Sequence, residues 1–302
     1  MAGVRLAIKV DVDTDRGTRL GVPALLDLFD EFGIEATFLF SLGPDNTGRA
    51  IKRIFRPGFF SKVARTSVVS TYGLRTLLNG VLWPGPHIGR RNEAILRAAR
   101  DRGHEVGVHC YDHIRWQDGL ATMTRAEVYN EFAKARREFA RIFAAPAKTA
   151  GAAGWQANAH SLAAYDDAGL KYASDVRGTH PFFPQADGTV YKTLQIPTTL
   201  PTQDELLGRP EYPRARLADH YLALMRPERA NVLTAHAEIE GMAELAWFRG
   251  FLLQARERRV RFVRLDHMAE MLLQKPRLIP TCLLVDGQID GRSGTLATQR
   301  CL

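Results

Sequence analysis

Cysteine is scarce in this chain of 302 residues, which contains only Cys110, Cys282 and Cys301. Such an odd and sparse set argues against a disulfide framework and favours a reducing compartment. The first residues run straight into an alternating segment at 4–10, without the apolar stretch of a signal peptide. No apolar run approaches the roughly 18 residues that a membrane-spanning helix needs. We therefore expect a cytoplasmic protein.

Acidic residues are absent from one long segment, residues 46–92, although the whole chain carries 33 of them against 41 Lys and Arg. The basic residues of this segment are Arg49, Lys52, Arg53, Arg56, Lys62, Arg65, Arg75, Arg90 and Arg91. Bulky apolar residues such as Phe55, Phe59 and Trp83 lie between them. This mixture is typical of a membrane-interface segment and differs from a polar nucleic-acid groove. We predict a basic amphipathic insert that docks on an anionic inner-membrane surface; the alternative is that its apolar residues pack on the rest of the protein.

Short strand patterns alternate with helix patterns along most of the chain. The predicted strands cover residues 4–10, 36–40, 105–108, 149–155, 172–175, 194–196, 231–235 and 261–263. About eight strands in alternation with helices favour an α/β fold with parallel strands, closed or partly closed into a barrel. We predict that this barrel occupies residues 1–275, insert included. Residues 276–302 are then a C-terminal extension.

Two histidines four residues apart, His109 and His113, follow the predicted strand at 105–108. If the chain turns helically there, both imidazoles lie on one face and can bind the same metal ion. Asp11 and Asp13 follow the first strand and offer a carboxylate ligand. Functional groups of α/β barrels gather at the carboxyl ends of the strands. We predict one divalent ion held by Asp13, His109 and His113; Zn²⁺, Mn²⁺ and Co²⁺ all suit these ligands.

The remaining strand-end groups complete a set for hydrolysis of an amide. Asp11 is predicted to accept the proton of an attacking water as general base. His236, at the end of the strand 231–235, is predicted to protonate the departing nitrogen as general acid. Backbone N–H groups at residues 153–155 are candidates for an oxyanion hole, because small side chains let the backbone approach closely.

Five further residues at strand ends are predicted to contact the substrate. They are Gly154, Trp155, Asp175, Arg177 and Glu238. Two of them have a structural alternative, since Trp155 can serve packing and Glu238 can be a surface charge. A sugar substrate would favour the functional reading for Trp155, whose ring can stack on it.

The Asp-x-Asp motif of Asp11 and Asp13, the His-x-x-x-His motif and His236 together resemble the polysaccharide deacetylase, or NodB-homology, family. Longer motifs resemble the branch of this family that deformylates 4-deoxy-4-formamido-L-arabinose-phosphoundecaprenol. These motifs are residues 10–14, 43–46, 152–155, 195–197, 200–202 and 236–238. The likeness extends over essentially the whole chain.

The resemblance implies a distorted TIM-like barrel, a divalent metal cofactor and a lipid-linked amino sugar as substrate. It also implies a role in lipid A modification and resistance to polymyxin. The broad family has adjacent aspartates, so the roles of Asp11 and Asp13 could be exchanged here. Its arginine-rich third motif is replaced by residues 152–155, and Arg177 is the residue we expect to orient Asp11 instead. A soluble N-acetylated sugar is the alternative substrate.

Overall fold

A computed structural model of the chain describes residues 3–50 and 76–301. Residues 51–75, which make up much of the predicted basic insert, lie outside the described residues. Among the helices of the described ranges, none is both long and apolar enough to cross a membrane.

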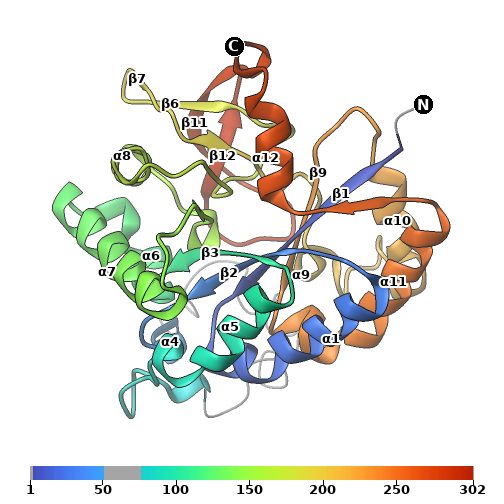
Figure 1. Cartoon of the computed structure of the whole chain (residues 1–302), viewed down its shortest axis with the longest axis horizontal. Coiled ribbons are helices and arrows are strands. Elements are labelled where there is room, and N and C mark those ends of the chain that lie inside the picture. The colour runs from blue at the N-terminus through green and yellow to red at the C-terminus, as the bar shows by residue number, and fades with distance from the viewer. Residues whose placement is uncertain (1–2, 51–75, 302) are drawn as a thin grey trace.

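A curved sheet of eight parallel strands forms the body of the protein (Figure 1). Its strands are β1 (Arg5–Val12), β2 (Thr37–Ser41), β3 (Glu105–Cys110), β4 (Thr149–Ala150), β5 (Tyr172–Ala173), β8 (Leu194–Gln195), β9 (Asn231–His236) and β10 (Arg261–Val263). β1 is central, because it pairs with β2, β9 and β10. Hydrogen bonds between Thr199 and Val232, at 2.9 and 3.2 Å, span the gap between the β8 and β9 ends of the sheet. The sheet is therefore a distorted, partly closed barrel, which confirms the predicted fold class.

Helices cover the outside of this barrel (Figure 1). They are α1 (Val22–Phe32), α4 (Ile88–Arg91), α5 (Glu93–Asp101), α6 (His113–Gly119), α7 (Arg125–Phe143), α8 (Ala159–Ala168), α9 (Gln203–Leu206), α10 (Leu217–Leu224), α11 (Leu245–Glu257) and α12 (Leu265–Leu273). Buried aromatic rings join them to the sheet; Phe29 of α1, for example, contacts Phe38 of β2 and Phe248 of α11. Each such fully buried ring contributes about 1.5–3 kcal/mol of hydrophobic stabilisation.

Local sequence features mark the ends of several helices. Gly33 ends α1 in the left-handed conformation, with φ 63°, which glycine adopts without steric cost. Thr124 and Glu127 form a capping box at the start of α7, as the spacing Thr-x-x-Glu favours. The last helix, α12, has Arg264 as its N-cap residue, and Asp266 lies in its first turn.

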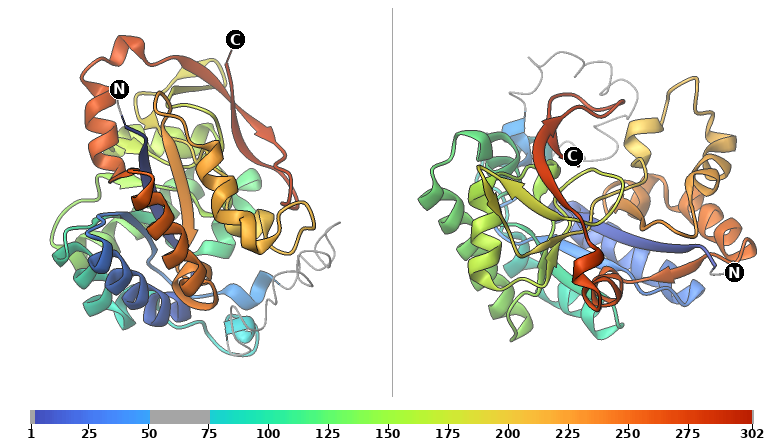
Figure 2. Two further views of the ribbon diagram at one scale, coloured as in Figure 1. Left: turned by 90° about the vertical axis from the view of Figure 1, so that its right-hand side faces the viewer. Right: turned by 90° about the horizontal axis from the view of Figure 1, so that it is seen from above.

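The C-terminal segment pairs with residues 183–190 in a second sheet, which was not predicted from the sequence. Its order is β12 (Leu296–Arg300), β11 (Thr281–Gly287), β6 (Phe183–Ala186) and β7 (Thr189–Val190), and β11 runs parallel to β6 (Figure 2). Antiparallel pairing of β11 with β12 brings Cys282 and Cys301 together in a disulfide. The expectation of a chain without disulfides is therefore wrong for this pair. Cys110 is buried and free.

Candidate active site

The five predicted catalytic and metal-binding side chains lie at one end of the barrel. Asp11 and His236 are register partners on the neighbouring parallel strands β1 and β9. Asp13 follows β1, His109 lies near the end of β3, and His113 is the first residue of α6. Because parallel strands end at the same edge, the fold brings these distant residues together.

Three of these side chains form a compact group of metal ligands. Oδ1 of Asp13 lies 3.2 Å from Nε2 of His109 and 3.4 Å from Nε2 of His113. This oxygen is buried and has no hydrogen-bond partner among the described residues. Two imidazole nitrogens and one carboxylate oxygen thus face a common point, which is the donor set of a three-ligand metal site with open positions. The residues fit a divalent ion.

Neighbouring groups fix the orientation of both histidines. Nδ1 of His109 donates to the carbonyl of Gly151 at 2.6 Å, which leaves the lone pair of Nε2 for a metal ion. Asp112 caps α6 by accepting from the N–H of Arg115 at 3.0 Å. Its other oxygen accepts from Asn46 at 2.7 Å, so the start of α6, where His113 lies, is held from two sides.

Charges in this group perturb its proton affinities. Burial raises the pKa of Asp13, but the charge of His113 and the close contacts of His109 and His113 with the carboxylate outweigh it and hold the pKa well below its usual value. Burial lowers the pKa of His109, while Asp11 and Asp13 raise it by more, so the net shift is upward. Protons and a metal ion therefore compete for these side chains, and cation binding should weaken as the pH falls.

Asp11 has a cationic partner, Lys9, that was not predicted from the sequence. Its Oδ2 lies 3.4 Å from Nζ of Lys9, and Lys9 also donates to the carbonyl of Ser174 at 3.1 Å. Both Lys9 and Asp11 are buried, and Oδ1 of Asp11 has no hydrogen-bond partner among the described residues. Lys9 therefore holds one carboxylate oxygen and leaves the other for the reaction.

The expectation that Arg177 orients Asp11 is wrong. Arg177 is buried, forms its ion pair with Glu205 and donates to the carbonyl of Leu200 at 3.1 Å.

The sequence of β1 does indicate the contact between Lys9 and Asp11, because residues two apart in a strand point to the same face. Lys9 and Asp11 satisfy that spacing, so the alternation that predicted the strand also predicts their contact.

Replacing Lys9 with methionine should destabilise the fold by about 3–5 kcal/mol, because it leaves the Asp11 carboxylate buried without its partner. Turnover should fall as well. Lys9→Arg, which keeps the positive charge, should retain more of the stability and more of the turnover than Lys9→Met. Urea unfolding and steady-state kinetics measure these effects. In an Asp11→Asn background the same Lys9→Met change should cost much less, as a double-mutant cycle requires for a direct pair. Equal costs in both backgrounds would contradict the pairing.

The loop after β4 brings Trp155 to the site. Asp175 is fully buried; it accepts from the N–H of Ala152 at 2.7 Å and from Gln195 at 2.8 Å, and burial raises its pKa to about 6. Gly154 and Trp155 then take left-handed conformations, with φ 62° and 54°. The Trp155 ring lies 6.1 Å from that of His236, between centroids. The substrate contacts of Gly154, Trp155 and Asp175 stay predictions.

The oxyanion hole proposed for residues 153–155 also stays a prediction. The N–H of Trp155 donates to the carbonyl of Ala152 at 3.1 Å, so this donor already serves the turn.

Two buried glutamates support the strand ends. Oε1 of Glu238 accepts from the N–H groups of Asp13 and Thr14, at 3.1 and 2.9 Å, and from the Thr14 hydroxyl at 2.8 Å. Burial and then the charge of Asp13 raise the pKa of Glu238 well above its usual value. Glu240 accepts from the N–H of His236 at 2.7 Å, and burial raises its pKa to about 8. Glu238 thus holds the loop that carries Asp13; its contact with substrate stays a prediction.

The chain is similar to proteins of known family. Residues 13–173 match the polysaccharide deacetylase family. A Shewanella sediminis (strain HAW-EB3) protein is 39% identical over 98% of this chain and 94% of its own length. A Wigglesworthia glossinidia brevipalpis protein is 32% identical over 94% of this chain and 98% of its own. Both carry the name "Probable 4-deoxy-4-formamido-L-arabinose-phosphoundecaprenol deformylase ArnD".

Solved structures share the fold at low sequence identity. A polysaccharide deacetylase structure from Mycobacterium smegmatis superposes with a TM-score of 0.62 at 18% identity, covering 92% of this chain and 93% of the other. One from Pseudomonas aeruginosa PAO1 gives 0.59 at 15% identity, with 90% and 92% covered. The Puue allantoinase also gives 0.59, at 17% identity, with 90% and 91% covered. At these identities the likeness concerns the fold alone.

Proposed function

The chain belongs to the polysaccharide deacetylase family and is an amide hydrolase, and from that premise we propose that it removes the formyl group of 4-deoxy-4-formamido-L-arabinose-phosphoundecaprenol. The observation that carries the chemistry is the convergence of Asp13, His109 and His113 on one point beside Asp11 and His236. The choice of substrate is supported by the two named relatives, which match almost the full chain.

The chain's own groups divide the work of hydrolysis. Asp13, His109 and His113 would hold a divalent ion, which when bound lowers the pKa of a water and polarises the formyl carbonyl. Asp11, held by Lys9, accepts the proton of the attacking water through its free Oδ1. His236 approaches from β9 and protonates the sugar nitrogen as the C–N bond breaks. Formate and the free amino sugar are the products.

The product would be an aminoarabinose lipid. The motifs shared with the deformylase branch imply its use in lipid A modification and in resistance to polymyxin and other cationic peptides. The protein would then work at the cytoplasmic face of the inner membrane, where a polyprenyl-linked sugar is held by its lipid tail.

Release of formate from the purified protein tests this function. The protein is incubated with the formamido-arabinose lipid, with the matching acetamido lipid and with a soluble N-acetylated amino sugar. We expect formate from the first and little acetate from the other two. Turnover of the soluble acetylated sugar with none of the formamido lipid would overturn the proposal in favour of a deacetylase.

Exposed apolar residues in the described part of the insert support membrane docking. Val81, Leu82 and Trp83 are 52%, 66% and 41% exposed. The turn that carries them is tied to the site, because Asn79 donates to Asp45 at 3.3 Å and the neighbouring Asn46 binds the Asp112 cap of α6. An apolar tip at this position would bring the barrel mouth to the lipid surface.

Replacing both Leu82 and Trp83 with alanine should weaken binding to anionic phosphatidylglycerol vesicles at least ~10-fold, because burying two such side chains contributes a few kcal/mol. Vesicle co-sedimentation in moderate salt measures the change. Leu278→Ala is the matched control, since Leu278 is 77% exposed but lies in the segment leading to β11. An equal loss in both proteins, or none in either, would count against this docking surface.

A further inference from the structure

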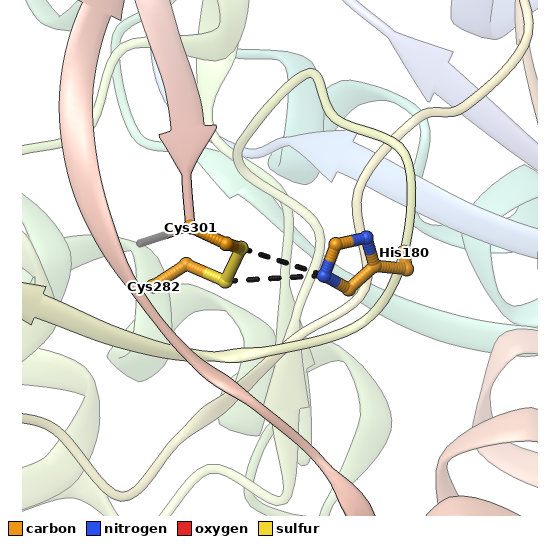
Figure 3. A group of neighbouring side chains, drawn as sticks. All are labelled: His180, Cys282 and Cys301. Carbon is orange, nitrogen blue, oxygen red and sulfur yellow. Dashed lines mark hydrogen bonds between the residues drawn. A yellow bond between two sulfur atoms is a disulfide. The ribbon is translucent and has the colours of Figure 1, made fainter.

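A second group of metal-binding side chain types lies away from the catalytic site. His180 precedes β6, Cys282 lies on β11, and Cys301 follows β12 (Figure 3). Nε2 of His180 lies 3.4 Å from Sγ of Cys301 and 3.9 Å from Sγ of Cys282. The proposed deformylation uses none of the three.

The donor atoms are those of a zinc site. Two cysteine sulfurs and one imidazole nitrogen lie within 4.8 Å of one another. Thiolate and imidazole ligands favour Zn²⁺, whereas the carboxylate of the catalytic site also suits harder ions. The two groups therefore differ in ligand chemistry as well as in position.

Hydrogen bonds from Thr179 and Gln299 orient the same three residues for binding a metal ion. Nδ1 of His180 lies 2.8 Å from the Thr179 hydroxyl; if it donates there, the lone pair of Nε2 faces the sulfurs. Oε1 of Gln299 accepts from the N–H of Thr179 at 2.5 Å and from that of His180 at 3.1 Å. Nε2 of Gln299 lies 3.5 Å from Sγ of Cys301 and 3.8 Å from Sγ of Cys282, where it can donate to thiolates.

We propose that the reduced form of this cluster binds a zinc ion through Cys282, Cys301 and His180, so that disulfide and zinc are two exclusive states of one site. Reduction uses two molecules of a small thiol: the Cys282–Cys301 bond breaks, both cysteines gain a proton, and the small thiols are oxidised to their own disulfide. Zinc then replaces the two thiol protons and forms two Zn–S bonds, and the lone pair of His180 completes three protein ligands.

The position of the cluster leaves room for a fourth ligand. Cys301 and His180 line a cavity of about 370 Å³, together with Arg177, Thr198, Thr298 and Gln299. A water molecule in this cavity could complete a tetrahedral coordination. Both states join β12 to β11, and the zinc-bound state would add a bond to the His180 side chain, whose backbone N–H already donates to Gln299 of β12.

Cobalt binding tests the proposal, because a thiolate–cobalt bond gives charge-transfer absorption that carboxylate and imidazole ligands do not. The full chain, reduced and kept free of oxygen, should bind two equivalents of Co²⁺, one of them with this absorption. The same protein with the disulfide formed should bind one equivalent without it. Because this comparison needs no variant, misfolding of a mutant cannot obscure it.

Substitutions identify the residues that give rise to the charge-transfer absorption. The Cys282→Ser/Cys301→Ser double variant, which removes both thiolates of the cluster, should lose the absorption and keep one equivalent at the Asp13 site, which also shows that it is folded. His113→Ala should keep the absorption and lose the other equivalent. Thr179→Val should weaken the thiolate-linked equivalent about 10- to 100-fold. The proposal is overturned if reduced protein, with its thiols confirmed by titration, gives no charge-transfer absorption, or if the absorption survives in the Cys282→Ser/Cys301→Ser double variant and so arises from Cys110.

Discussion

Replacing His113 with alanine is expected to lower formate release at least ~10³-fold, because the ion that activates water and polarises the carbonyl contributes several kcal/mol to the rate. The remaining ligands, Asp13 and His109, cannot hold a divalent ion tightly as a pair. Metal content per chain should fall together with turnover. Kinetics on the formamido lipid and elemental analysis of the same preparation measure both quantities.

His267→Ala is the matched control for this change. His267 is an exposed histidine of α12. At the start of this helix the N–H of Leu265 donates to the hydroxyl of Thr37, the first residue of β2, so α12 begins at the amino end of the sheet, opposite the site. This variant should keep its metal and its rate. A His113→Ala protein that is folded and retains full turnover would rule out the proposed site.

Substitutions of Asp11 and Asp13 should differ in their effect on metal content. Asp11→Asn is expected to lower turnover about 10²- to 10⁴-fold, the usual contribution of a general base, with the metal retained. Asp13→Asn should lose both metal and turnover, because its Oδ1 is the atom that faces both histidines. Metal content therefore distinguishes the base from the ligand, although both substitutions lower turnover.

The reverse result is equally informative. If Asp11→Asn loses the metal while Asp13→Asn keeps it, the roles are exchanged, as the altered spacing of the motif allowed. Geometry argues against that exchange, because Asp11 is paired with Lys9 and lies 3.9 Å from Nδ1 of His109, the nitrogen that faces away from the ligand group.

Local patterns were sufficient to predict much of the barrel and the gathering of its polar strand ends. Asp11, His109 and His236 each follow or end an apolar strand, and parallel strands bring such positions to one edge. Helix boundaries followed from local chemistry as well, as Gly33 and the Thr124 capping box show. These predictions need no knowledge of which distant segments pair.

Other features depend on long-range packing that no short pattern contains. Cys282 and Cys301 meet only because β12 folds back on β11, and β11 in turn pairs with β6, about a hundred residues earlier in the chain. Glu238 is buried and accepts from the backbone N–H of Asp13, a contact between residues far apart in the chain that no local pattern predicts. A buried carboxylate that bonds to a distant loop has the same sequence signature as an exposed one.

The most direct test of the account is the metal dependence of the wild-type protein. With the Cys282–Cys301 disulfide intact, the purified chain should carry one divalent ion, lose it together with formate release on treatment with a chelator, and regain both when Zn²⁺, Mn²⁺ or Co²⁺ is restored. His113→Ala, treated in parallel, should regain neither. Formate release at an undiminished rate from protein shown to be free of metal would contradict the account.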